Sequence, residues 1–197
     1  MVIIQTPKWT MIFITFMVGM MVVVSISLIL QSIKAEKAEA KYSILNNHKD
    51  IQRVLTYWEN RGNGRTHLIK LIEVVQLGTS NTYIAFFEMD SDMLGTAILK
   101  EGSNQKLDIL NSQSGGGPVR YDGVKTNHGD YGILTGRKAN KQIQSIRVEV
   151  LNDPLKFTVQ VPEKDYFIIV NQLPDGKGSK PFADLYLLDK NNEEITP

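Results

Sequence analysis

Four acidic residues and one histidine are the residues of this sequence whose types and spacing could bind a metal ion. Asp90 and Asp92 are spaced like the opening of a calcium loop, in which alternating carboxylates supply oxygen ligands. Asp122, His128 and Asp130 follow further along the chain. Because carboxylate oxygens and imidazole nitrogens are common metal ligands, these five residues are the candidate metal site of the sequence.

The loop that begins at Asp90 matches a calcium loop only in part. Counted from Asp90, the sixth position is Gly95 and the twelfth is Glu101, as such a loop requires. The fifth position is Leu94, which starts an apolar run instead of supplying a ligand. A hairpin turn is therefore the favoured interpretation and a calcium site the alternative. A turn also explains His128 and Asp130, because a glycine separates them.

Other catalytic and cofactor motifs have no support in the sequence. The stretch Ser112–Pro118 contains three consecutive glycines that could cradle an anion, but no Gly-Lys-Ser/Thr sequence follows. We expect it to be a mobile surface loop. The chain has no cysteine, no Gly-x-Ser-x-Gly elbow and no zinc-helix motif at His48 or His67. No cofactor is predicted, and a non-enzymatic role is favoured while catalysis stays open.

Alternating apolar residues predict that these side chains are carried by β-strands. In residues 155–161 every odd-numbered residue is apolar, and residues 145–150 alternate in the same way, with Asn152-Asp153-Pro154 between them. This pattern predicts a hairpin. Further strands are predicted at residues 67–77, 82–89, 95–100, 107–110, 131–135, 165–171 and 183–188.

Turn signals separate these predicted strands at the spacing of an all-β domain. They include Asp122-Gly123, His128-Gly129-Asp130, Asp175-Gly176 and Asn191-Asn192. We therefore expect a mainly β chain in which residues 63–197 form an antiparallel β-sandwich or barrel-like domain. Residues 68–75 fit a helix almost as well as a strand.

Four of the strand patterns resemble those of a group of bacterial proteins. They are Tyr83-Ile84-Ala85-Phe86-Phe87-Glu88, Tyr131-Gly132-Ile133-Leu134-Thr135-Gly136, Ile146-Arg147-Val148-Glu149-Val150 and Leu185-Tyr186-Leu187-Leu188-Asp189-Lys190. Their order resembles that of uncharacterised small exported or membrane-anchored β domains of Bacillus-type bacteria, over residues 67–195. The resemblance implies a cell-surface domain outside a Gram-positive membrane, and it implies no ligand or site residue.

An uncharged segment from Trp9 to Leu30 predicts a single transmembrane helix. Its 22 residues include no charge, Asn, Gln, His or Pro, and as a helix they cover roughly 33 Å, close to the roughly 30 Å core of a bilayer. The segment exceeds the apolar core of a cleaved signal, and no cysteine could carry a lipid. Residues 1–8 form a short tail before this uncleaved anchor.

Residues 31–62 are predicted to be a helical stalk between the anchor and the β domain. From Ile33 to Asn60 the sequence lacks Gly and Pro, and an apolar stripe recurs at helical spacing. The stripe consists of Ile44, Ile51, Leu55 and Trp58. We expect it to pack on the domain that follows, since it is too short for a coiled coil, and the helix to stop at Gly62 and Gly64.

Charge excludes one class of partner and leaves the topology open. Residues 42–197 carry 18 basic and 19 acidic residues, so a nucleic-acid partner is not expected. Lys8 precedes the span and Lys34, Lys37 and Lys41 follow it, which taken literally puts the domain inside the cell. Long domains are translocated largely regardless of such charges, so we favour an extracytoplasmic domain.

These features predict three possible functions. The favoured one is a membrane-anchored binding or interaction module of the cell envelope with a protein or envelope partner. The alternatives are an envelope enzyme or metal-dependent binder that uses the loops around Asp90 and His128, and a membrane-tethered regulator with a cytoplasmic domain.

Overall fold

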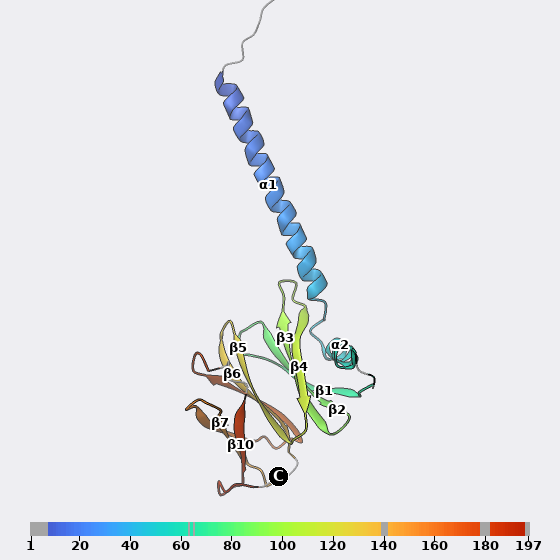
Figure 1. The fold of residues 1–197 in the computed structure, drawn as a ribbon, viewed down its shortest axis with the longest axis vertical. Coiled ribbons are helices and arrows are strands. Elements are labelled where there is room, and N and C mark those ends of the chain that lie inside the picture. Colours follow the sequence, from blue (N-terminus) through green and yellow to red (C-terminus); the bar gives the residue numbers. More distant parts are fainter. Residues whose placement is uncertain (1–7, 63, 65, 139–141, 178–181, 196–197) are drawn as a thin grey trace, which may run out of the picture. The chain divides into compact units, whose positions relative to one another are not determined.

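The computed structural model describes residues 8–62, 64, 66–138, 142–177 and 182–195. Within the first helix it leaves the side chains of residues 8–16, 18 and 34–40 undescribed. The chain is mainly antiparallel β, with three sheets and two helices among the described residues (Figure 1). It divides into two compact units, Met1–Ser43 and Ile44–Pro197.

The first unit consists of helix α1, Lys8–Lys41. The Ser25 hydroxyl donates a 2.8 Å hydrogen bond to the carbonyl of Met21, one turn earlier, which satisfies a polar group inside an apolar stretch. Among the described residues, no helix has the length and apolarity needed to cross a membrane. Much of the predicted span from Trp9 to Leu30 lies outside the described side chains, so the span stays a prediction.

The stalk prediction is wrong in one respect, because the helix does not continue from Ile33 to Asn60. α1 ends at Lys41 and a second helix, α2, runs from His48 to Asn60. Asn47 has an extended backbone, and its side chain accepts a hydrogen bond from the Asp50 amide, which is the usual way to start a helix. Ile44, before this start, pairs instead with Leu107 in an isolated β-bridge.

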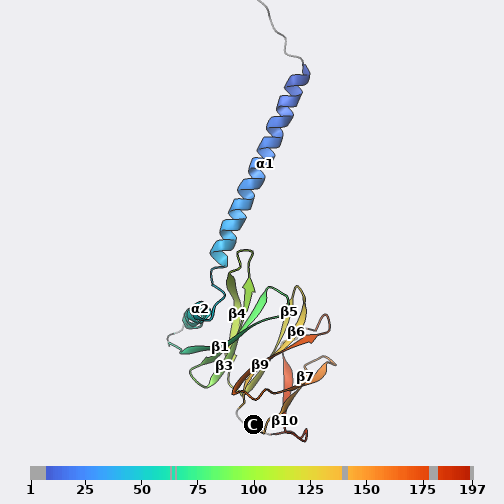
Figure 2. The ribbon, with the colours of Figure 1, turned by 180° about the vertical axis from the view of Figure 1, so that it is seen from behind.

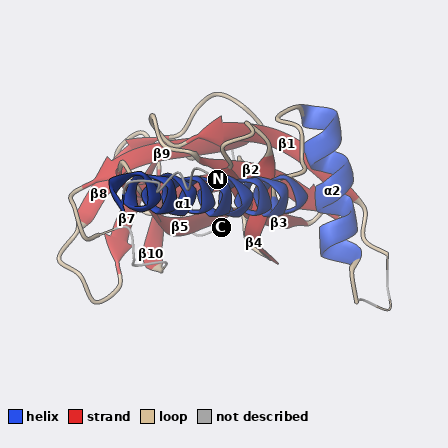
Figure 3. Cartoon of the chain, turned by 90° about the horizontal axis from the view of Figure 1, so that it is seen from above, coloured by secondary structure: helices blue, strands red, loops and turns tan. Residues whose placement is uncertain are grey.

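Helix α2 packs on the domain that follows it, as the apolar stripe predicted. Ile51 and Leu55 are buried against the first sheet, and the Trp58 indole N–H donates a 2.9 Å hydrogen bond to the Ser112 hydroxyl. Figure 3 shows α2 beside strand β1, Ile69–Gln76. The stripe is therefore buried within the second unit and is not available for a coiled coil.

The strands of the second unit form three antiparallel sheets (Figure 2). The first sheet has the order β1-β2-β3-β4, with β2 at Thr82–Met89, β3 at Met93–Glu101 and β4 at Leu107–Gly115. The second has the order β5-β6-β9, with bounds Val119–Thr126, Gly129–Arg137 and Tyr166–Leu173. The third has the order β10-β7-β8, with bounds Ala183–Leu188, Ser145–Val150 and Lys156–Gln160.

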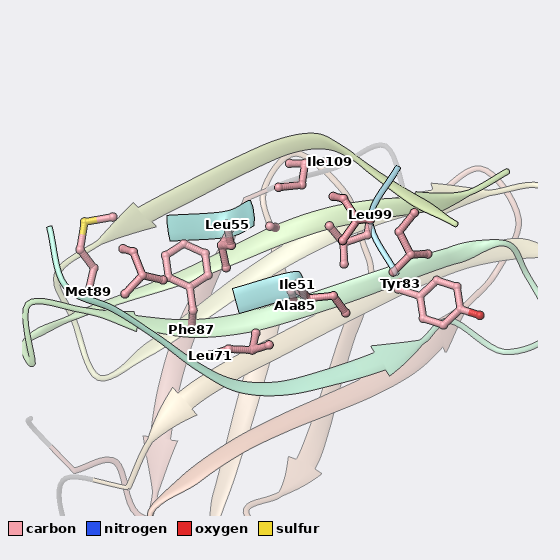
Figure 4. Close-up of a cluster of buried hydrophobic side chains, with 13 residues drawn as sticks. Ile51, Leu55, Leu71, Tyr83, Ala85, Phe87, Met89, Leu99 and Ile109 are labelled. Atoms are coloured by element: carbon pink, nitrogen blue, oxygen red, sulfur yellow. The ribbon is translucent and has the colours of Figure 1, made fainter. Parts of the chain in front are cut away.

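Three apolar clusters join these elements into layers. The first lies between α2 and one face of the first sheet, where Leu55 meets Phe87 and its neighbours (Figure 4). The second joins the first and second sheets and includes Ile84 and Ile133. The third joins the second and third sheets and includes Leu134. Because strand side chains alternate between faces, Ile133 and Leu134 point into different clusters.

Most strand predictions are confirmed, and the exceptions lie around β5. Strands β2 and β10 coincide with their predicted bounds, the hairpin of β7 and β8 is present, and of residues 68–75 all but Leu68 belong to β1 and none to a helix. The prediction of a turn at Asp122-Gly123 is wrong, because both residues lie inside β5. Part of the expected Ser112–Pro118 loop also belongs to β4, which ends at Gly115.

Candidate functional site

The five candidate metal ligands do not form a cluster in the structure. Among the described residues, no group of three or more His, Cys, Asp or Glu side chains could hold a metal ion. Asp122 pairs with Ile133 and Asp130 pairs with Lys125 in the same β5–β6 ladder. Asp130 shares a face of the sheet with its partner Lys125. Positions 122 and 125 of β5 differ by an odd number, so Asp122 and Asp130 lie on opposite faces.

Asp90 stabilises a turn between β2 and β3. Its carboxylate lies 2.6 Å from Nδ1 of His67 and accepts a 2.8 Å hydrogen bond from the amide of Leu68. The hydrogen bond with His67, followed by the one from Leu68, lowers the pKa of Asp90. Asp92 is an exposed residue of the same turn. Gly95 and Glu101 lie within β3, so the calcium-loop alternative lacks a loop at its sixth and twelfth positions.

His128 and Asp130 belong to the β5–β6 hairpin and face different surroundings. His128 is an exposed turn residue whose amide donates to the Thr126 hydroxyl at 3.0 Å. Asp130 is buried in β6, and its Oδ2 has no hydrogen-bond partner within the described part of the chain. The turn interpretation therefore accounts for His128. It does not account for the buried Asp130, whose Oδ2 has no partner among the described residues.

Of the five candidates, Asp122 is the one that belongs to a buried network of side-chain hydrogen bonds. It is buried between the first and second sheets, where it accepts a 2.8 Å hydrogen bond from the Thr96 hydroxyl and a second from the side-chain amide of Gln113. Burial raises the pKa of Asp122, although these two hydrogen bonds and the charge of Arg120 act in the opposite direction. This network satisfies a buried carboxyl group and links β3, β4 and β5.

A β-bulge in β4 brings Gln113 into this network. Ile98 pairs with Asn111 while the next residue, Leu99, pairs with Ile109, so Leu110 is left without a partner in the ladder. The extra residue reverses the alternation of side chains beyond it. As a result Gln113 faces the same way as its partner Thr96, toward Asp122, and Leu110 is left 47% exposed.

Beside this bulge lies a cleft between the edges of two sheets. Its volume is about 390 Å³, within the range of small-molecule sites. Its lining includes Ile98 and Lys100 of β3, Leu110 and Asn111 of β4, and residues 123–127 at the end of β5. Strand β4 is the last strand of the first sheet and β5 the first of the second. The cleft therefore borders two strands that each have an unpaired edge.

The side chains around the cleft are apolar, amide, hydroxyl and basic. Lys100 and Lys125 are the charged residues of its lining, which has no carboxylate. Within the described residues neither lysine lies within 4.0 Å of an acidic group. Such a lining can contact a ligand through apolar packing, hydrogen bonds and the positive charges of the two lysines, which suits binding.

Sequence reasoning missed this cleft, since its walls come from four strands, β2 to β5, whose places are set by the sheet order. The signal that could have pointed to it is Leu110, an apolar residue that breaks the alternation of Leu107 and Ile109. Only the pairing register shows that this irregularity is a bulge at an open edge.

Replacement of Asp122 by asparagine is expected to change how stability depends on pH. A carboxyl whose pKa is raised by folding stabilises the fold most below its ordinary value, and this contribution is lost as pH rises through the folded pKa. Asp122→Asn lacks that titration and keeps an oxygen for Gln113. We therefore expect the variant to gain stability relative to the parent chain as pH rises from acidic to neutral.

Urea unfolding of both full chains across that pH range measures the effect. Asp122→Leu serves as a contrast, because it leaves Thr96 and Gln113 without their acceptor and should cost about 1–3 kcal/mol near neutral pH. Parallel stability curves for the parent and Asp122→Asn would show that Asp122 does not titrate differently in the fold.

Comparisons with known proteins add no functional assignment. No protein-family model, no curated protein and no solved structure matches this chain.

Proposed function

We propose that this chain is a single-pass membrane protein whose helix α1 anchors a β-sandwich domain outside the cytoplasm, where the domain acts as a non-catalytic binding module. The three stacked clusters support the sandwich, and the cleft between β4 and β5 is the proposed binding site. The proposed membrane anchoring is argued from α1, and the proposed binding is argued from the second unit.

The observation that carries the anchor is the apolar surface of α1. From Met20 to Leu30 its large apolar side chains are all at least half exposed, and they occur on every face of the helix. Such a surface is unfavourable in water and needs either lipid or a partner to cover it. The uncharged run from Trp9 to Leu30 has the length that a bilayer requires. We therefore favour lipid as the cover.

A test of the anchor uses charge placed in the middle of α1. Val23→Arg combined with Ile26→Arg should release the chain from membranes washed with alkaline carbonate, because each arginine costs about 2.5–3.5 kcal/mol at the centre of a span. Leu45→Arg, outside α1, is the matched control and should leave the chain in the membrane pellet. Retention of the double variant in the pellet would contradict a lipid-spanning α1.

The side of display can be measured with one introduced thiol. The chain has no cysteine, so Lys190→Cys, in an exposed turn after β10, provides a single site. We expect a membrane-impermeant maleimide to label this variant in intact cells. Labelling only after lysis would contradict an extracytoplasmic domain and support the cytoplasmic regulator that Lys34, Lys37 and Lys41 favour.

A further inference from the structure

We propose that the cleft between β4 and β5 binds an extended acidic peptide segment of a partner protein, which pairs with β5 as an added strand. This inference rests on the proposed binding function and names the chemistry of the partner. Three features of the cleft carry it: the open edge of β5, the bulge in β4 and the two lysines.

The backbone of β5 offers hydrogen-bonding groups to the cleft. The amide of Arg137 donates to the carbonyl of Pro118, and the register continues from Val119↔Gly136 to Thr126↔Gly129 without a shift. In an antiparallel ladder bonded pairs alternate with pairs whose N–H and C=O groups point outward. Residues 119, 121, 123 and 125 therefore direct these groups away from β6, toward the side where β5 has no hydrogen-bonded strand.

The cleft lies where this edge is accessible. Both Gly123 and Lys125, two residues with outward backbone groups, belong to its lining. Gly123 has no side chain that could cover the edge. An exposed edge with free N–H and C=O groups is a template for strand addition, and peptide-binding domains use such edges in this way.

The bulge in β4 keeps the opposite wall of the cleft from covering the open edge of β5. Leu110 has no partner in the β3–β4 ladder and is 47% exposed at the cleft. Together with Ile98 and Val124 it forms an apolar wall beside the polar edge. An added strand could thus place alternate side chains against this wall while its backbone bonds to β5.

The charges favour an acidic segment. Lys100 lies opposite Asp108 in the β3–β4 ladder, and Lys125 lies opposite Asp130 in the β5–β6 ladder. Neither lysine forms an ion pair with these or other acidic groups of the described chain. Val124 and Lys125 point to opposite faces of β5, so an added strand that packs one set of alternate side chains on the apolar wall would turn the other set toward Lys125. Carboxylates in that second set would give the Lys125 ammonium group a partner, and Lys100 adds positive charge at the cleft, which favours acidic sequences over basic ones.

Fluorescence anisotropy with three labelled octapeptides tests the proposal on the full chain in mild detergent. The probes are an alternating Thr-Glu peptide, an alternating Thr-Lys peptide, and the Thr-Glu peptide with every backbone amide N-methylated. We expect the Thr-Glu peptide to bind, the Thr-Lys peptide not to bind, and N-methylation to weaken binding at least about tenfold, because it removes the donors for strand pairing.

Charge reversal locates the site. Lys125→Glu should weaken binding of the Thr-Glu peptide about tenfold, whereas Lys190→Glu, the same change on an exposed turn away from the cleft, should not alter it. Equal binding of the N-methylated peptide, equal effects of the two variants, or no binding of the Thr-Glu peptide would each overturn the proposal. The proposed anchored display is judged separately, by carbonate washing and thiol labelling, so the two can fail independently.

Discussion

Replacement of Leu55 by alanine is expected to lower the free energy of unfolding of the full chain by about 2–5 kcal/mol. Leu55 is fully buried between α2 and the first sheet, against a cluster that includes Phe87 and Leu99 (Figure 4). Removal of its side chain leaves a cavity, because the strands on one side and the helix on the other cannot collapse into it completely.

Urea unfolding followed by the fluorescence of Trp58 measures this effect, in a chain where Trp9 is replaced by phenylalanine. Trp58 reports on the same interface through its 2.9 Å hydrogen bond to Ser112. Leu68→Ala is the matched control, because Leu68 is 72% exposed and its loss should change stability by less than about 0.5 kcal/mol. Similar losses for the two variants would show that α2 is a stalk and not a layer of the domain.

Replacement of Phe86 by alanine should be more damaging still, with an expected loss of about 3–5 kcal/mol. Phe86 is fully buried and alternates with Phe87, so it faces the second sheet and not α2. Its ring packs edge-to-face with that of Tyr166, with ring centres 6.3 Å apart. The Tyr166 hydroxyl in turn donates a 2.6 Å hydrogen bond to Glu88, so the cavity would lie beside a polar pair that depends on close packing.

Thermal unfolding of the full chain compares this variant with Phe182→Ala. Phe182 is 69% exposed, and the same substitution there should have an effect of less than about 0.5 kcal/mol. If Phe86→Ala were no more destabilising than Phe182→Ala, the first and second sheets would not be packed face to face.

Local patterns predicted the strands well, because each pattern needs only its own residues. The alternation in residues 155–161 predicted β8 and its hairpin with β7, and the apolar run 82–89 predicted β2. Strand β5 was missed because Asp122-Gly123 is a strong local turn signal. The burial of Asp122 within this strand depends on Thr96 and Gln113, which come from two other strands.

The break between α1 and α2 could not be predicted for a similar reason. Residues 42–47 contain neither Gly nor Pro, and Ile44 continues a helical apolar stripe. In the structure Ile44 exchanges two backbone hydrogen bonds with Leu107, which is distant in the sequence. The cleft is equally non-local, because Lys100, Leu110 and Lys125 become neighbours only through the order of strands and the bulge.

Hydrogen exchange of the full chain with and without the Thr-Glu octapeptide is the most direct test of the central claim, that the chain binds its partner at the open edge of β5. Bound peptide is expected to slow exchange of the outward amides of β5, at residues 121, 123 and 125, while β8, the edge strand of the third sheet, exchanges as before. Protection at β8, or unchanged exchange in β5 at a peptide concentration that saturates binding, would contradict the claim.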